Sequence, residues 1–273
     1  MPDVILVVVD QPRAVSAQLG AANHLAGLLG DARVEVLAVH IAAEATILPT
    51  EEILTTRRKT EWETAERLRL EALHGAYLRW QADGGEAARC SDWRVEEGDP
   101  EAVVAEYGRR CDYLVIARPA NREGGSSRDI VHAALFETSR PVLVVPETFR
   151  GTFGRRVAIA FKDDGRAEKA ILAAMPLLRQ AEQVCVFGGA RDDMSAPALP
   201  NILTEHAIPA TVCGMLVGER GTFGAALLAA VTEAGHDMLV MGAYAHNPWR
   251  ELLLGGVTRH VLAVANIPVL MRH

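Results

Sequence analysis

The stretch "HDMLVMG", residues 236–242, decides the fold because the chain carries its pattern twice. An earlier stretch, "CDYLVIA" at 111–117, has the same aspartate followed by the same kind of apolar run. Each copy is followed by a second matching pair, "SRPVLVV" at 139–145 and "NIPVLM" at 266–271. A fixed-order repeat of this length indicates tandem duplication of a whole domain.

Short runs of Val, Leu and Ile alternate with helix-length stretches in both copies. The runs are continuously apolar, which is typical of parallel strands covered on both faces. The expected strands are 4–10, 34–41, 113–118 and 141–146 in the first copy, and 157–161, 183–188, 210–216, 238–242 and 268–271 in the second. The predicted fold class is α/β: two tandem doubly wound domains, each a mostly parallel five-stranded sheet flanked by helices.

The helix-length stretches have apolar residues at helical spacing. The expected helices are 14–29, 51–80, 100–110, 167–178, 225–234 and 258–264. Asp99 and Pro100 are typical of an N-cap and a first helical residue. The longest stretch is charged and gathers five residues roughly along one side: Trp62, Ala65, Ala72, Ala76 and Trp80.

The domain boundary is expected in "PETFRGTFGRR" at 146–156, because this stretch is polar and rich in Pro and Gly. The first domain is therefore predicted over 1–148 and the second over 155–273.

The charge and hydropathy of the chain bear on its partners. The net charge is −7 and the pI about 5.7, and such a chain repels the phosphate backbone of nucleic acid. The apolar run Val4–Val9 lacks a basic flank and a cleavage site, so it predicts a first strand rather than a signal peptide. No apolar run is long enough to cross a bilayer. We expect a cytoplasmic protein with no nucleic-acid and no membrane partner.

The four cysteines are Cys90, Cys111, Cys185 and Cys213. They form no C-x-x-C pair and no metal-like spacing with histidine, which predicts reduced thiols and no metal site. The chain also lacks a Walker loop, a dinucleotide fingerprint and a nucleophile elbow. These absences predict a protein with no catalytic residues.

Doubly wound sheets bind ligands beyond the carboxyl ends of their strands, where the strand order reverses. Gly242 ends a predicted strand, and a residue without a Cβ allows a ligand to approach the backbone. Gly255 and Gly256 precede the helix expected at 258–264, whose free N–H groups attract phosphate. A tight turn with Thr258 as a helix cap explains the same residues, and both interpretations stay open.

The repeat, with "MLVMG", "LLLGGVTRHVL" and "PVLM" in the second copy, resembles the universal stress protein (UspA-like) family in its tandem form. Nucleotide-binding members carry G-x2-G-x9-G-[S/T] after the fourth strand. The corresponding positions are Gly242, Ala245, Gly255 and Gly256, so the spacing is kept and two identities depart. Thr258 matches a further hydroxyl position of the family.

The family also places an aspartate after the first strand, near the base and ribose. The second copy has Lys162 there, whereas the first copy has Asp10. In the first copy the later motif is missing, with Ala117 and Ala120 at the first two glycine positions and Ile130 at the third. Gly124 and Gly125 are interpreted as flexible loop residues.

The resemblance implies an adenine-nucleotide site, for ATP or a related nucleotide, in the second domain, and a role in stress response. The candidate binding residues are Ala160, Phe161, Lys162, Met241, Gly242, Ala245, His246, Gly255, Gly256, Val257 and Thr258. The alternative is an interaction or regulatory protein that binds no nucleotide because both sites are degenerate. A slow ATPase is disfavoured, since no general base is evident near Gly255.

Family members dimerise through their last strands. The resemblance therefore implies an intrachain pseudo-dimer of the two domains, with 141–145 paired near 268–271. A homo-oligomer is left open.

Overall fold

A computed structural model describes residues 2–30, 32–43, 56–119, 125–162, 165–188, 199–215, 222–243 and 256–273. Its strands are β1 (Asp3–Val9), β2 (Ala32–His40), β3 (Asp92–Glu97), β4 (Tyr113–Ala117), β5 (Val142–Val145), β6 (Arg156–Ala160), β7 (Gln183–Phe187), β8 (Thr211–Cys213), β9 (Met238–Gly242) and β10 (Val269–Arg272). They form one ten-stranded sheet with the order β3-β2-β1-β4-β5-β10-β9-β6-β7-β8.

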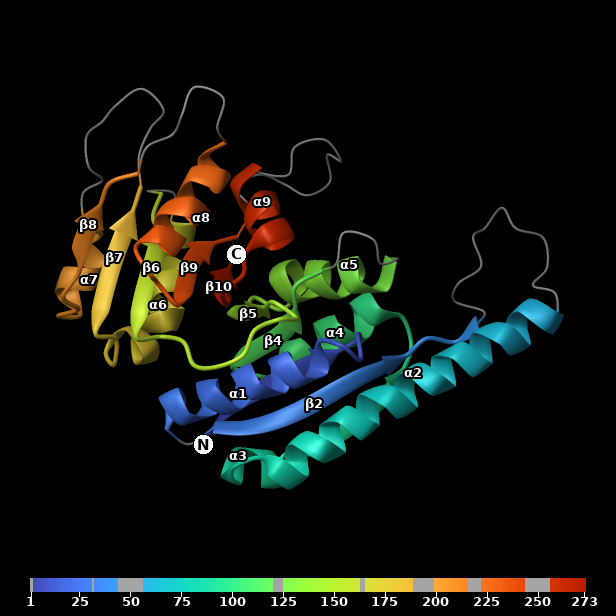
Figure 1. Cartoon of the computed structure of the whole chain (residues 1–273). Coiled ribbons are helices and arrows are strands. Elements are labelled where there is room, and N and C mark those ends of the chain that lie inside the picture. The colour runs from blue at the N-terminus through green and yellow to red at the C-terminus, as the bar shows by residue number, and fades with distance from the viewer. Residues whose placement is uncertain are drawn as a thin grey trace.

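The helices of the described residues lie on both faces of this sheet (Figure 1). They are α1 (Val15–Leu29), α2 (Thr56–Asp83), α3 (Glu86–Arg89), α4 (Pro100–Gly108), α5 (Gly125–His132) with the π-helical turn η2 (Ala133–Glu137), α6 (Arg166–Leu178), α7 (Asn201–Glu205), α8 (Phe223–Glu233) and α9 (Gly256–Val264). The N-cap expected at Asp99 is confirmed, since its carboxylate accepts the N–H of Ala102 at 3.0 Å. No helix within these ranges is both long and apolar enough to span a bilayer.

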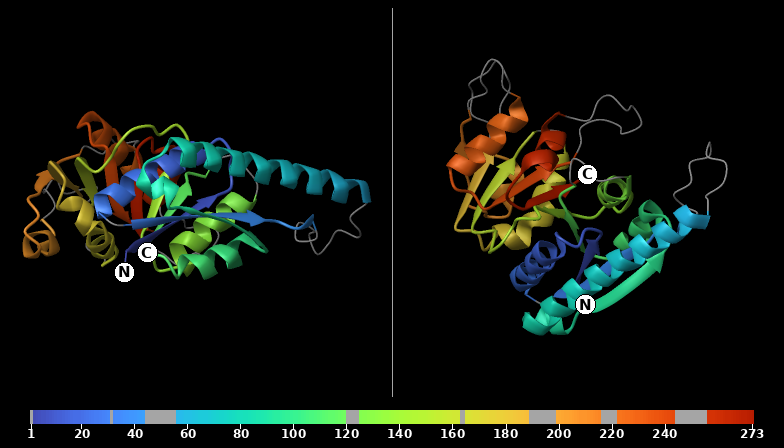
Figure 2. Two further views of the ribbon diagram at one scale, coloured as in Figure 1. Left: turned by 90° about the horizontal axis from the view of Figure 1, so that it is seen from below. Right: turned by 45° about the vertical axis from the view of Figure 1, so that its right-hand side comes forward.

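The sheet consists of two five-stranded halves that meet at their last strands. Strands within each half are parallel, whereas β5 and β10 are antiparallel, with Leu143 opposite Leu270. The pairing expected between 141–145 and 268–271 is therefore present in the chain. The two halves lie side by side in all views, and α2 extends along the first half alone (Figures 1 and 2). The predicted class of two tandem doubly wound domains is the observed one.

Strand β3 (Asp92–Glu97) was not among the strands expected from the sequence. It forms the outer edge of the first half, and most of its side chains are exposed. An edge strand has only one neighbour and little burial, so its polar sequence "DWRVEE" lacks the apolar run that identified the others.

The predicted side of α2 was right only in part, because Trp62, Ala76 and Trp80 are half-buried. Ala65 and Ala72 are exposed, while Glu66, Leu73 and Tyr77 are buried. The helix buries a carboxylate because Arg69 neutralises it, a pairing that hydrophobic spacing does not reveal.

The repeated aspartate has the same structural task in both halves. Asp112 accepts the N–H of Val4 at 2.9 Å, at the start of the first strand. Asp237 accepts the N–H groups of Gly154 at 2.8 Å and of Arg156 at 3.2 Å. Each carboxylate therefore ties the entry of its fourth strand to the entry of its first strand, which explains why both copies of the repeat keep it.

Replacing Asp237 by alanine is expected to lower the free energy of unfolding by about 2 kcal/mol, because it leaves several backbone N–H groups without their acceptor. Urea unfolding of the full chain measures this loss. Glu233→Ala is the matched control, since it removes one negative charge from an exposed position nearby. Equal losses in the two variants would contradict the role assigned to Asp237.

Two apolar cores run through both halves, one on each face of the sheet. On the first face α1 and α6 pack together, and the Tyr113 hydroxyl donates to the carbonyl of Ala173 at 2.8 Å. On the second face the core includes Val104, Leu227 and Val261 from α4, α8 and α9. The cores fix the halves against each other and position the ends of their strands.

Candidate functional site

The candidate site lies at the carboxyl ends of β6 and β9. In the sheet, β7 and β8 lie on one side of β6, and β9 and β10 lie on the other, so the strand order reverses at β6. Ala160 is in register with Met241, and the N–H of Phe161 donates to the carbonyl of Phe187 at 2.8 Å. The structure therefore brings two predicted groups of site residues, 160–162 and 241–242, to the switch point of the second half.

The third predicted group begins helix α9. Gly256 is its first residue and is exposed, Val257 is half-buried and Thr258 is buried. A Cβ built on Gly256 meets no atom within 4 Å. The predicted site residues Ala245, His246 and Gly255 lie outside the described residues, so the structure does not place the middle of the motif.

Gly242 has a packing reason to be glycine. A Cβ at this position would lie 2.9 Å from the Cβ of Arg166 and 3.0 Å from the backbone nitrogen of Ala167. The first turn of α6 therefore occupies the space beside Gly242, where the sequence predicted that a ligand could approach the backbone. The glycine allows this close contact between helix and strand.

Gly242→Ala is expected to lower the free energy of unfolding by about 1–3 kcal/mol, because backbone atoms of α6 must move to admit the methyl group. Chemical denaturation measures the change. Gly27→Ala is the control, since a Cβ at Gly27 in α1 meets nothing within 4 Å and alanine favours a helix. A Gly242→Ala variant as stable as the wild type would show that α6 does not need this glycine.

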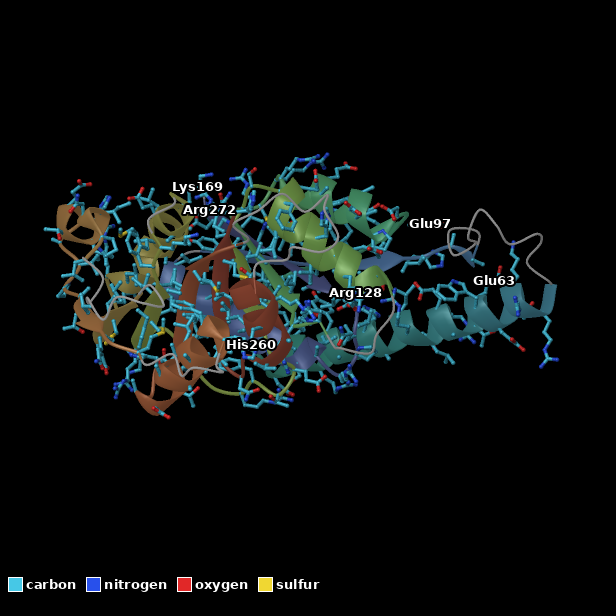
Figure 3. All side chains as sticks on the ribbon, turned by 90° about the horizontal axis from the view of Figure 1, so that it is seen from above. Glu63, Glu97, Arg128, Lys169, His260 and Arg272 are labelled. Atoms are coloured by element: carbon cyan, nitrogen blue, oxygen red, sulfur yellow. A yellow bond between two sulfur atoms is a disulfide. The ribbon has the colours of Figure 1, made fainter. Side chains whose placement is uncertain are left out.

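Cationic side chains gather at this edge of the second half. Arg272 pairs in register with Gly242, Arg166 begins α6, and Lys169 follows in the same helix. Figure 3 shows Lys169 and Arg272 labelled close to each other. Burial, together with the charges of Arg166 and Lys169, lowers the pKa of His273.

These cations, with Lys162, make the edge locally basic in a chain whose net charge is −7. Glu168 adds one carboxylate to the first turn of α6. Of these four cations, only Lys162 was among the site residues predicted from the sequence. Arg272, for example, ends the last strand of the repeat, far along the chain from Lys162.

The first half starts its last helix in the same way as the second. Helix α5 begins at Gly125 and α9 at Gly256, so "GGSSR" at 124–128 corresponds to "GGVTR" at 255–259. The interpretation of Gly125 as a flexible loop residue was therefore wrong, because counting residues along an unequal loop misaligned the copies. The loop before the helix is shorter in the first half.

The first half closes its own site with side chains. The hydroxyl of Ser127, the counterpart of Thr258, donates a short hydrogen bond to the carboxylate of Asp10. The amide of Gln11 donates to the same hydroxyl at 3.1 Å. Asp10, for which the resemblance implied a nucleotide contact, is thus already paired within the protein.

Arg69 of α2 covers the neighbouring strand ends in the first half. Its guanidinium donates to the carbonyls of Asp10 and Val39 and, at 2.7 Å, to both oxygens of Glu66. The Glu66 carboxylate also accepts the N–H of Ile41 at 3.0 Å. Burial raises the pKa of Glu66, but the hydrogen bonds from Arg69 and Ile41 outweigh it, so the net shift is downward.

A small cavity of about 110 Å³ lies at the outer edge of the first half, lined in part by Arg33, Glu35, Arg94 and Tyr107. Nucleotide-sized ligands need several hundred Å³. Its charged walls also pair with each other, as Arg33 does with Glu35. It is therefore a separate feature from the strand-end site.

Comparison with known proteins agrees with this architecture. Residues 157–273 match the model of the Universal stress protein family. No curated protein matches the chain by sequence. Among solved structures, a universal stress protein from Archaeoglobus fulgidus DSM 4304 is 15% identical, with a TM-score of 0.65, over 99% of this chain and 96% of that chain.

Two proteins from Pseudomonas aeruginosa are similar over 99% of this chain. One, of unknown function, from strain PAO1, is 14% identical over 92% of its own length, and the other, a putative universal stress protein from UCBPP-PA14, is 15% identical over 93%. Both have a TM-score of 0.56. At these identities the likeness shows the fold. Residues 157–273 thus match the universal stress protein family, and the first half has the same fold.

Proposed function

We propose that the second domain binds an adenine nucleotide, ATP in the first place, and that the protein acts in stress response as a binding protein rather than an enzyme. The observation that carries this proposal is the switch point of the second half. Ala160 of β6 and Met241 of β9 lie side by side there, and α9 is the helix that follows β9 in the chain. This is where doubly wound sheets bind ligands.

The chemistry of this edge supports an anionic ligand. The N-terminus of α9 carries the positive end of the helix dipole, which favours anions. Thr258 supplies a hydroxyl in the first turn, and Gly256 leaves space beside it. The cations Arg166, Lys169 and Arg272 add positive charge.

The first domain is the weaker candidate for the same ligand. Its Asp10 is bonded to Ser127, and Arg69 lies across the ends of β1 and β2. A nucleotide at that edge has to displace hydrogen bonds that are already made. We therefore assign binding to the second domain alone.

Lys162 and Gly256 set the expected affinity. A hydroxyl missing at Gly256 removes about one hydrogen bond to a charged group, worth about 1.5–3 kcal/mol. Lys162 replaces a carboxylate acceptor by a donor. We expect binding that is roughly tens to hundreds of times weaker than in a domain with the complete motif.

Calorimetric titration of the full chain with ATP tests the proposal. Thr258→Val is expected to weaken binding roughly 10–100-fold, because it removes one hydroxyl donor to a charged group. Ser127→Ala is the matched control, since Ser127 is the third residue of α5 as Thr258 is the third of α9. It is expected to leave the affinity unchanged.

Two outcomes would contradict this assignment. Binding that is lost in Ser127→Ala and kept in Thr258→Val would move the site to the first domain. No heat at millimolar ATP would overturn the nucleotide proposal. That result would favour the alternative, an interaction protein whose first site is closed by its own side chains.

A further inference from the structure

Three side chains with metal-binding chemistry meet near the outer edge of the second half. They are Cys185 in β7, Cys213 in β8 and His236 just before β9. Each offers a ligand atom, and these atoms lie within 4.8 Å of one another. The two cysteines are disulfide-bonded in the structure, with their Cα atoms 5.9 Å apart. The expectation of reduced thiols is therefore wrong for this pair, because parallel pairing of β7 and β8 brings them together.

His236 is the unexplained member of the cluster. Its side chain is 4% exposed, and neither ring nitrogen has a hydrogen-bond partner among the described residues. The backbone of Arg156 lies near the ring outside hydrogen-bond geometry. The other neighbour is the ring of Phe187, edge-on at 5.6 Å. Burying two unpaired polar nitrogens is unfavourable, so the ring is arranged for a partner that the protein does not itself supply.

The equivalent positions of the first half show that the cluster is particular to the second. Leu6 pairs with Glu35 as Ala158 pairs with Cys185. One step further out, Leu37 pairs with Arg94 as Phe187 pairs with Cys213. Cys111 takes the place of His236 in the repeat and donates its thiol to the carbonyl of Gly108. The fold therefore does not require a Cys, Cys, His set at this position.

We propose that the reduced second domain binds a thiophilic metal ion, with zinc(II) as the reference, through Cys185, Cys213 and His236. Zinc takes Cys sulfur at about 2.3 Å and His nitrogen at about 2.0–2.1 Å in tetrahedral geometry, which sets ligand atoms roughly 3.5–3.8 Å apart. Three atoms within 4.8 Å fit this arrangement after the sulfurs separate. Cys213 is half-buried, so water reaches the fourth position.

Metal binding and the disulfide exclude each other. Reduction by a dithiol transfers two electrons and two protons to the Cys185–Cys213 bond, and the dithiol becomes a cyclic disulfide. Zinc then displaces both thiol protons and binds two thiolates and the neutral imidazole of His236. The site thus holds either a sulfur–sulfur bond or a metal ion. This proposal is independent of nucleotide binding.

Cobalt(II) titration of the full chain tests the site. The chain is first reduced with excess dithiol, and the dithiol is then removed under anaerobic conditions. The reduced chain is titrated with cobalt(II), whose absorption bands report tetrahedral thiolate ligation. We expect one cobalt per chain with sulfur-to-cobalt bands, displacement by one zinc, and no bands from the oxidised chain. Cys213→Ser and His236→Gln are expected to lose stoichiometric binding.

Cys90→Ser is the matched control, because Cys90 is an exposed cysteine outside the cluster, and it is expected to bind as the wild type does. Circular dichroism and thermal unfolding verify that each variant folds. Cys213→Ser replaces one sulfur by oxygen at a half-buried position, so we expect this variant to fold. The proposal is overturned if the reduced wild type shows no sulfur-to-cobalt band. It is equally overturned if Cys213→Ser keeps the band, or if the disulfide persists in excess dithiol.

Discussion

Arg69→Met is expected to lower the free energy of unfolding by about 3 kcal/mol, because breaking a buried ion pair leaves an uncompensated charge. Glu66 is 5% exposed and would remain in place with only the N–H of Ile41 to bind its carboxylate. Two strand-end carbonyls, those of Asp10 and Val39, would lose their donor as well. Methionine keeps most of the aliphatic volume, so the loss reports the charge and the hydrogen bonds.

Urea unfolding of the full chain measures this change. Arg67→Met is the matched control two residues away, where the side chain is 61% exposed and pairs with Glu71 on the helix surface. Exposed pairs of this kind contribute about 0.3–0.5 kcal/mol. If both variants lose the same small amount, Arg69 does not hold α2 against the strand ends.

The Glu66–Arg69 ion pair makes the stability loss of Arg69→Met depend on pH. The pKa of Glu66 is lowered in the folded wild type, so its contribution is present above the unfolded pKa of about 4.3 and disappears as the pH falls through the folded value. Without Arg69, burial opposes the charged form of Glu66. The difference in stability between wild type and Arg69→Met is therefore expected to shrink from pH 7 to pH 4. A constant difference would assign the loss to packing.

Gly256→Ser is expected to tighten ATP binding roughly 10–100-fold. The change supplies the hydroxyl that the resemblance implies for this position, and a hydrogen bond to a charged group contributes about 1.5–3 kcal/mol. The structure offers room, since a Cβ at Gly256 meets no atom within 4 Å. Serine is also favourable at the start of a helix, so α9 is not weakened.

Calorimetry against the wild type measures the gain. Gly20→Ser in α1 is the control, because a Cβ at Gly20 also meets nothing within 4 Å and the residue lies in the other half. It is expected to leave ATP affinity unchanged. An unchanged affinity in Gly256→Ser would place the phosphates away from the start of α9, even if the protein binds ATP.

Much of the fold could be predicted because its strands are buried on both faces. Runs such as Val157–Ala160 and Met238–Met241 are continuously apolar, which is typical of parallel strands between two helix layers. Strand β3 escaped prediction because it is an exposed edge. The buried side of α2 was predicted only in part because it includes the charged Glu66, which is paired with Arg69 and which apolar spacing does not identify.

The candidate site was predictable in part. The sequence placed Gly256 and Thr258 at the start of a helix and Lys162 after a strand, and the structure has them there. It did not reveal that Gly242 faces the first turn of α6, or that Ser127 binds Asp10. Both contacts join segments that are far apart in the chain.

By itself, the sequence determined the duplication, the parallel strands and the likeness of the second half to a known family, because these depend on local apolar patterns and on the order of the repeat. Tertiary structure alone decided which residues of the pattern touch. Cys185, Cys213 and His236 come from three segments with no motif spacing, and only strand register and the α8 crossover bring them within 4.8 Å. Register and crossover set such contacts through packing of the whole domain, which no local stretch of sequence records.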